Sequence, residues 1–210
     1  MRTDRRRPPI LAIARLLERD LRPLGWRRFA IIGRALLHAP AHARRFARPS
    51  DDARLREAKR MLLLVGALHA EIRAAFGGPR ADAIVSALLL HASVTLQSSI
   101  YLAEPPARRT WEALHEAHDD VLARGLARVN DHGPIEARTS RVSFEVTRCR
   151  LVEALRDMGA IGVADALCRS DEIVFGRYLP EIRFHRGKDT PDTIARGAPS
   201  CRFVFERGPR

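Results

Sequence analysis

Lysine is almost absent from this chain of 210 residues, which holds 35 arginines but only two lysines. Cysteine is also scarce: three residues are too few for a disulfide framework, and their odd number leaves at least one thiol free. No apolar segment followed by a small-residue cleavage site is visible near the N-terminus. These absences favour a protein of the reducing cytoplasm over a secreted one.

Aromatic residues make up 6% of the sequence, so the core must be built mainly from Leu, Ala, Ile and Val, a composition that favours helices. Apolar residues contribute 46% and charged residues 30%, which is typical of a soluble globular protein rather than a disordered one. The length suits one sizeable domain, with or without an extension.

Basic charge is concentrated in the first 60 residues, which hold 17 Lys or Arg and 6 Asp or Glu. Residues 61–210 hold 20 and 19, so they are nearly neutral although the whole chain carries +12. A nucleic-acid-binding core would carry its own basic surface. We therefore expect no nucleic-acid partner.

Residues 1–50 are predicted to form a basic amphipathic helical arm, followed by a single domain over residues 51–210. On a helical wheel of residues 26–45, the cationic side is formed by Arg27, Arg34, His38 and Arg45. The apolar side is formed by Trp26, Phe29, Ile32, Gly33, Leu36 and Leu37, and the exceptions are Arg28 and Ile31. Such a helix can make peripheral contact with an anionic membrane, pack its apolar side on the domain, or belong to a mitochondrial transit peptide.

Two long helices are predicted in the middle of the chain. Residues 51–76 form the first, with Ser50 as its N-cap, and the Gly-Gly-Pro that follows ends it. Residues 82–103 form the second, which has no charged residue after Asp82 and is long enough to cross a bilayer. Its histidine, threonine, glutamine and four serines make it polar for a membrane span, so we expect a central helix buried on all sides.

The next predicted helix contains a Glu-x-x-His spacing, Glu112 with His115, and Asp119 follows one turn later. This spacing supplies metal ligands in helical bundles, but a single copy is more typical of a solvated charged face. His118 interrupts the apolar stripe of the same helix, so it needs a hydrogen-bond partner if it is buried.

From residue 140 onward the periodicity changes. Alternation at 142–146, 181–186 and 200–207 predicts strands, with two helices between the first strand and the second. The expected fold class is therefore α+β, with the helical first two thirds packed on a C-terminal antiparallel sheet.

The three cysteines all fall in this last part. Cys149 lies at a predicted helix N-terminus, where the helix dipole, Arg148 and Arg150 would lower the pKa of its thiol. Cys168 lies within a helix, and Cys201 follows the turn Arg-Gly-Ala-Pro-Ser. Three thiols can line a site, bind zinc together, or be buried structural residues, and their spacing lacks the Cys-x-x-Cys of ordinary zinc modules.

The order of these motifs resembles the L-2-amino-thiazoline-4-carboxylic acid hydrolase family over residues 144–205. The segments that carry the resemblance are ALRDMGA after Cys149, LCRSDE around Cys168, YLPEIRF, and TIARGAPSCRFVF. The last segment, with Thr193, Gly197, Cys201 and Phe203, is also similar to the C-terminal signature of vinyl-reductase-type ligand-binding domains.

The resemblance implies a bacterial hydrolase that acts on a small molecule and opens a cyclic amidine by breaking a carbon–nitrogen bond. The cysteines would act as nucleophiles or as ligands of a metal such as zinc, and an arginine would hold the substrate carboxylate. The implied catalytic residues are Cys149, Cys168, Cys201 and Asp171. The implied substrate-binding residues are Arg148, Arg186, Thr193 and Gly197.

Two features depart from the family pattern: Arg202 follows the last cysteine, and residues 187–192 lengthen the loop before Thr193. His185, beside this loop, is the histidine that we would mutate first. The alternative interpretation is a non-catalytic regulatory domain of the vinyl-reductase type that binds a small ligand or a metal. An accessible thiol of low pKa favours the enzyme, and inert thiols favour the binding domain.

Overall fold

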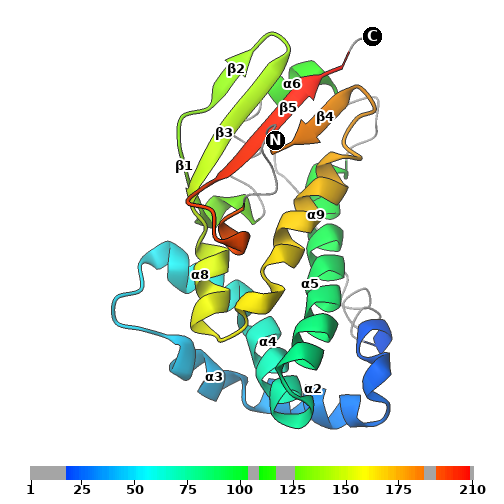
Figure 1. Ribbon diagram of the computed structural model, residues 1–210, viewed down its shortest axis with the longest axis vertical. Helices are drawn as coiled ribbons and strands as arrows, with labels where there is room; N and C mark the ends of the chain where they lie inside the picture. Colours follow the sequence, from blue (N-terminus) through cyan, green and yellow to red (C-terminus); the bar gives the residue numbers. More distant parts are fainter. Residues whose placement is uncertain (1–17, 104–108, 117–125, 187–192, 209–210) are drawn as a thin grey trace.

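The computed structural model describes residues 18–103, 109–116, 126–186 and 193–208. Figure 1 shows helices in one half of the molecule and an antiparallel sheet in the other, which confirms the α+β class. The main helices are α2 (Arg27–Leu37), α3 (Ala39–Phe46), α4 (Ala53–Phe76), α5 (Gly78–Tyr101), α6 (Trp111–Glu116), α8 (Arg150–Asp157) and α9 (Asp165–Phe175). The short 3-10 turns are η1 (Arg22–Leu24), η3 (Ala127–Val129), η4 (Ile161–Val163) and η5 (Ile194–Arg196).

Helices α4 and α5 pack against each other at the centre of the helical half. The N-cap of α4 is Asp52 and not the predicted Ser50: the Asp52 carboxylate accepts a hydrogen bond from the Leu55 N–H at 2.7 Å. Gly77, with φ 86°, separates the two helices, and α5 starts four residues earlier than predicted. Pro79 fits there because the first helical turn needs no N–H from it.

The prediction that α5 is buried on all sides is wrong. Its buried positions form one face, which packs on α4 and α9, while most of its remaining residues are partly exposed. Those buried positions are Ala81, Ile84, Val85, Leu88, Leu89, Ser93, Gln97 and Tyr101. Within the described ranges α5 is the one helix with the length and apolar composition to cross a membrane, and its contacts here are those of a core helix.

Helix α2 buries a different face from the one predicted to pack on the domain. Ile31 is 1% exposed and Ala35 is fully buried against α4, although Ile31 was an exception to the wheel pattern. Of the predicted apolar side, Ile32 packs partly against the core, and the other large side chains are exposed. The boundary predicted at residue 50 falls between α3 and α4, and Phe46 at the end of α3 joins the helical core.

The sheet contains β1 (Asp131–His132), β2 (Glu136–Arg138), β3 (Arg141–Arg148), β4 (Ile182–His185) and β5 (Cys201–Arg207). Its order is β1-β3-β5-β4, with β2 also paired to β3, and all pairs are antiparallel. The three predicted strands are present as β3, β4 and β5. The short strands β1 and β2 were missed because Asn130, Gly133 and Pro134, which flank them, are typical of a turn.

Register places the alternating apolar residues of β3 and β5 on the face that covers the helices. Val146 pairs with Cys201, and Phe144 pairs with Phe203, whose rings stack at 4.8 Å between centroids. These residues and the upper ends of α5 and α9 form a second core, separate from that of the helical half. Cys149 touches both cores. The junction of the two cores is therefore where β3 passes into α8.

Candidate functional site

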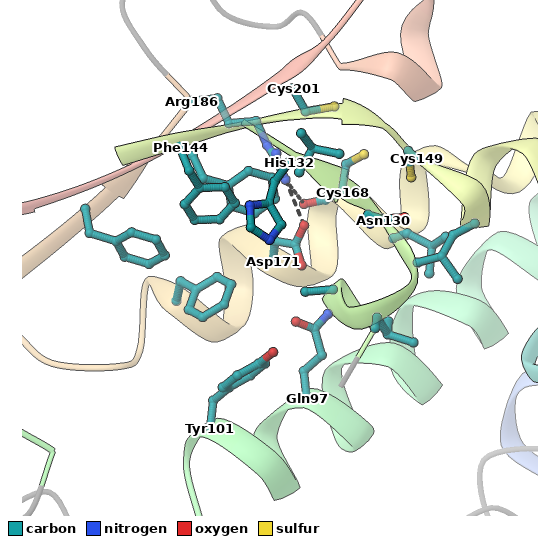
Figure 2. Close-up of a pocket in the computed structure, with 18 of the residues that line it drawn as sticks. Gln97, Tyr101, Asn130, His132, Phe144, Cys149, Cys168, Asp171, Arg186 and Cys201 are labelled. Atoms are coloured by element: carbon teal, nitrogen blue, oxygen red, sulfur yellow. Dashed lines mark hydrogen bonds and ion pairs between the residues drawn. The ribbon is translucent and has the colours of Figure 1, made fainter. Parts of the chain in front are cut away.

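A cavity of about 80 Å³ lies at this junction, enclosed by β3, β5, α5, α8 and α9. Its wall is mostly apolar. The polar side chains that reach it are Gln97, Tyr101, Asn130, His132, Asp171, Arg186 and the three cysteines (Figure 2). A small apolar cavity with a few converging polar groups is the usual form of a site for a small molecule.

Arg186 lies in this cavity because it follows β4 on the same face as Ile182 and Phe184. Its Nη2 donates hydrogen bonds to Asp171 Oδ2 at 2.9 Å and to the Cys168 carbonyl at 3.2 Å. The guanidinium carbon lies 4.5 Å from the centroid of the Phe203 ring.

The other two nitrogens of Arg186 have no hydrogen-bond partner among the described residues, although both are buried. The carboxylate of Glu172 is 3.9 Å from Nε, which is too far for a hydrogen bond. Only 3% of the Arg186 side chain is exposed. Buried donors without an acceptor are costly, so they mark a position where a bound anion would be stabilised.

Asp171 is the acidic partner of Arg186. Burial raises the pKa of its carboxyl, and this effect outweighs the charge and hydrogen bond of Arg186, which act in the opposite direction. About a fifth of the side chain remains accessible, and it lines the cavity. Gln97 faces it from α5 and also donates to Ser170 Oγ at 2.7 Å. A carboxyl whose neutral form is favoured in this way can donate a proton to a bound molecule.

All three cysteines are free and line the cavity. Burial raises the pKa of Cys149 to about 12 and that of Cys168 to about 11, and it also raises that of Cys201. The expected lowering at Cys149 is wrong in direction. The N–H groups of Leu151 and Val152 at the start of α8 do favour the thiolate, but burial dominates.

The two arginines beside Cys149 do not lower the pKa of its thiol, because both form ion pairs with carboxylates. Arg148 binds both oxygens of Glu153, at 2.7 and 2.9 Å, and lies outside the cavity wall. Of the two arginines predicted to hold a substrate carboxylate, only Arg186 is therefore in position. Arg150 is buried between Asp52 and Asp131, with contacts of 3.0 and 2.8 Å.

Thr193 and Gly197, predicted to bind substrate, shape the turn before β5 and do not line the cavity. The Thr193 carbonyl accepts N–H groups from Arg196 and Ala198, and Gly197 adopts φ 99°, a conformation that favours glycine. The buried Thr193 hydroxyl lies beside Cys168 and offsets a small part of the rise that burial causes in the pKa of that thiol.

His132 is a cavity residue that the sequence prediction missed. Its Nδ1 lies 3.0 Å from the Gly133 carbonyl. Since a carbonyl oxygen only accepts, the neutral ring carries its proton on Nδ1 and keeps a lone pair on Nε2. Its signal in the sequence, Asn-Asp-His-Gly-Pro, indicated only a turn. Gln97 was likewise noted only as a polar residue within an apolar helix.

The remaining candidates lie elsewhere. His185 is 3.2 Å from Glu206 on the adjacent strand β5 and does not line the cavity. Arg202 is exposed on β5, away from the cavity. His118, Asp119 and residues 187–192 lie outside the described residues. Within the described ranges no three His, Cys, Asp or Glu side chains are arranged to hold a metal ion, so neither the cysteines nor His115 with Glu112 form such a group.

In a comparison with known protein families, the family model of L-2-amino-thiazoline-4-carboxylic acid hydrolase matches residues 56–205. No curated protein and no solved structure matches the chain. The match reaches far beyond the motifs at residues 144–205 and includes α4 and α5. The similarity to vinyl-reductase-type domains stays a prediction. The chain therefore belongs to the L-2-amino-thiazoline-4-carboxylic acid hydrolase family.

Proposed function

We propose that the protein hydrolyses a small cyclic amidine carboxylate, with L-2-amino-thiazoline-4-carboxylic acid as the first candidate. The observation that supports this most directly is Arg186, whose buried Nε and Nη1 have no partner in the described residues. A substrate carboxylate would supply the missing acceptor and pair with the guanidinium in an apolar environment. Binding there brings the ring beside Asp171 and His132, which line the same cavity.

In the proposed reaction, water is the nucleophile, because the thiols are too weakly acidic to be thiolates at neutral pH. His132 Nε2 takes a proton from water as its oxygen bonds to the ring carbon between nitrogen and sulfur, and Asp171 gives a proton to the ring nitrogen. The carbonyl then forms as one ring bond of this carbon breaks, and the proton of the added oxygen passes to the departing atom.

The sulfur is the better leaving atom, since a thiolate is a much weaker base than a nitrogen anion. We therefore propose cleavage of the carbon–sulfur bond, which differs from the carbon–nitrogen cleavage expected from the family resemblance. The product is a carbamoylated aminothiol, formed without any change of oxidation state. A non-catalytic domain that binds a small carboxylate is the second candidate, and the weakly acidic thiols favour it.

The test is incubation of the purified chain with L-2-amino-thiazoline-4-carboxylate, with mass spectrometry and separate assays for free thiol and free primary amine. We expect thiol to appear. Arg186→Met should lower kcat/KM about a hundredfold or more, since it removes a buried charged hydrogen-bonding group. Arg148→Met, outside the cavity, is the matched control and should leave kcat/KM unchanged.

Two further variants separate the proposed roles. His132→Gln and Asp171→Asn should lower kcat by about a hundredfold or more, while His132→Gln leaves the substrate Kd unchanged. Binding without turnover by the wild type would favour the second candidate. A wild type that neither binds nor converts the compound would contradict this substrate, and amine release in place of thiol would contradict the proposed bond.

A further inference from the structure

Helix α2 exposes a row of large apolar side chains. Trp26 is 77% exposed, Phe29 66%, Leu36 57% and Leu37 76%. With Gly33 between them, they follow the spacing i, i+3, i+7, i+10 and i+11, so they share one side of the helix. We call these five residues the α2 stripe. In the described part of the chain, Ile161 is the one other large apolar residue with comparable exposure.

The opposite side of α2 packs against the domain. Ile31 and Ala35 are buried against α4, so the helix is fixed in place without any contribution from the α2 stripe. Two polar residues between the faces, Arg34 and His38, contact Glu71 of α4 at 3.0 and 3.2 Å. The helix is therefore held with one apolar side inward and a second apolar side toward solvent, which is unusual for a soluble helix.

Positive charge surrounds the α2 stripe. Residues 21–50 contain seven arginines and no Asp or Glu. Two of the seven, Arg34 and Arg48, form ion pairs with acidic residues of the domain. No carboxylate of the described residues pairs with the other five, which are Arg22, Arg27, Arg28, Arg44 and Arg45. This positive charge favours an anionic partner, and the α2 stripe favours a partner that has an apolar layer.

The position of α2 and α3 in the fold suits such a partner. Figure 1 shows both helices along the end of the molecule farthest from the sheet, so a surface beneath them would not meet β3 or β5. Both helices also precede residue 56, where the family match begins. The α2 stripe is therefore a feature of this chain outside the segment that defines the family.

We infer that α2 and α3 dock the protein on an anionic phospholipid surface. The side chains of the α2 stripe enter the boundary between head groups and acyl chains, with Trp26 at the level of the head groups. The unpaired arginines contact lipid phosphates from its sides and from α3. The cavity, at the junction of the helices with the sheet, stays away from the lipid.

The test is flotation of the full chain with vesicles of phosphatidylcholine alone or with added phosphatidylglycerol, at low and high salt. We expect binding to the anionic vesicles that weakens at high salt. Trp26→Ser with Leu37→Ser should reduce binding at least about tenfold. Because both side chains are exposed, these changes leave the fold intact, which circular dichroism verifies. Ile161→Ser is the apolar control and should bind like the wild type.

Two double variants test whether binding requires the positive charge near the α2 stripe. Arg44→Gln with Arg45→Gln should weaken binding, by about fivefold for each arginine removed near the lipid surface. Arg138→Gln with Arg141→Gln makes the same change in net charge at the sheet end, where both residues are exposed, and should have no effect.

Three results would overturn the inference. Equal binding to neutral vesicles would show that anionic lipid is not the partner. Stripe variants that float like the wild type would assign any binding to another segment. A lipid-free dimer in sedimentation velocity that Trp26→Ser with Leu37→Ser converts to monomer would identify a second copy of this chain as the occupant.

Discussion

The side chain of Cys149 lies near Cys168 and Cys201 in the cavity wall, and a charge on any one of the three would raise the pKa of a neighbour. Burial acts in the same direction and more strongly. At neutral pH the wall therefore presents three neutral thiols, which behave as small apolar groups. This suits a cavity in which Arg186 and Asp171 interact strongly, because the surrounding wall is mostly apolar.

These thiols should react slowly with iodoacetamide in the folded protein. With a pKa of about 12, the thiolate fraction of Cys149 at pH 8 is roughly a thousandfold below that of an ordinary cysteine. Labelling rates followed by mass spectrometry should therefore rise tenfold per pH unit from pH 8 to pH 10, and should be far higher in urea. A native Cys149 that reacts as fast as the unfolded chain would contradict this prediction.

At the residue scale, the sequence predicted the membership of the site better than its chemistry. The three cysteines and Asp171 were named because they accompany the family motifs, and Arg186 because the resemblance implies an arginine that holds the substrate carboxylate. The direction of the pKa change at Cys149 was not predicted, because its burial depends on residues of α9 and β5, such as Cys168 and Cys201, that are distant in sequence. His132 was missed for a similar reason, since only the fold brings β1 to the cavity.

At the scale of single elements, Gly197 and Gly33 offer a direct comparison. Gly197 ends η5 with φ 99°, whereas Gly33 lies inside α2, and an added Cβ would meet no atom within 4 Å at either position. Gly197→Ala should lower the free energy of unfolding by about 1–2 kcal/mol because of backbone strain alone. Gly33→Ala should raise it by about 0.5–1 kcal/mol.

Urea denaturation of both variants measures these changes. Equal effects of the two substitutions would show that the backbone conformation at Gly197 is not what the turn requires. Because this turn positions Cys201, Gly197→Ala should also change the reactivity of that thiol, and Gly33→Ala should not.

Hydrophobic periodicity predicted the long helices and strands well, but it predicted less well which of their side chains the rest of the protein covers. The strands β3 and β5 alternate over seven or eight residues, so their inward faces could be predicted. Outward residues are less regular: Ser143 and Val204, which pair across these strands, are buried as well. In α2 the apolar positions exceed one face, and a wheel alone cannot indicate which of them the domain covers.

At the scale of the whole molecule, Arg150 joins the helical half to the sheet. It contacts Asp52 at the start of α4 and Asp131 in β1, and its own N–H donates to Asn130 Oδ1 at 3.0 Å. The pKa of Asp52 is lowered to about 2, with Arg150 as the largest cause. This cluster holds the start of α8 beside the cavity.

Arg150→Met should lower Tm by at least about 5 °C, because two carboxylates lose their shared partner. Arg148→Met, at the exposed end of the same cluster, should lower it much less. The pH dependence gives a second readout. Since the folded pKa of Asp52 lies below its ordinary value, its stabilisation is present above about pH 4 and is lost as the pH falls toward 2.

Thermal unfolding at several acidic pH values measures both effects. The wild type should lose stability between pH 4 and pH 2 more steeply than Arg150→Met. Parallel curves for the two proteins would contradict the role of this cluster.

The position of β5 has a consequence for how the chain is made. Because β5 lies between β3 and β4, those two strands are joined in the sheet only through β5. All the main helices precede β5 in the chain, so they can pack while the C-terminal segment is still in the ribosomal exit tunnel. The cavity can close only when β5 emerges. A nascent chain would therefore have packed helices and a cavity that is still open on the side of β5.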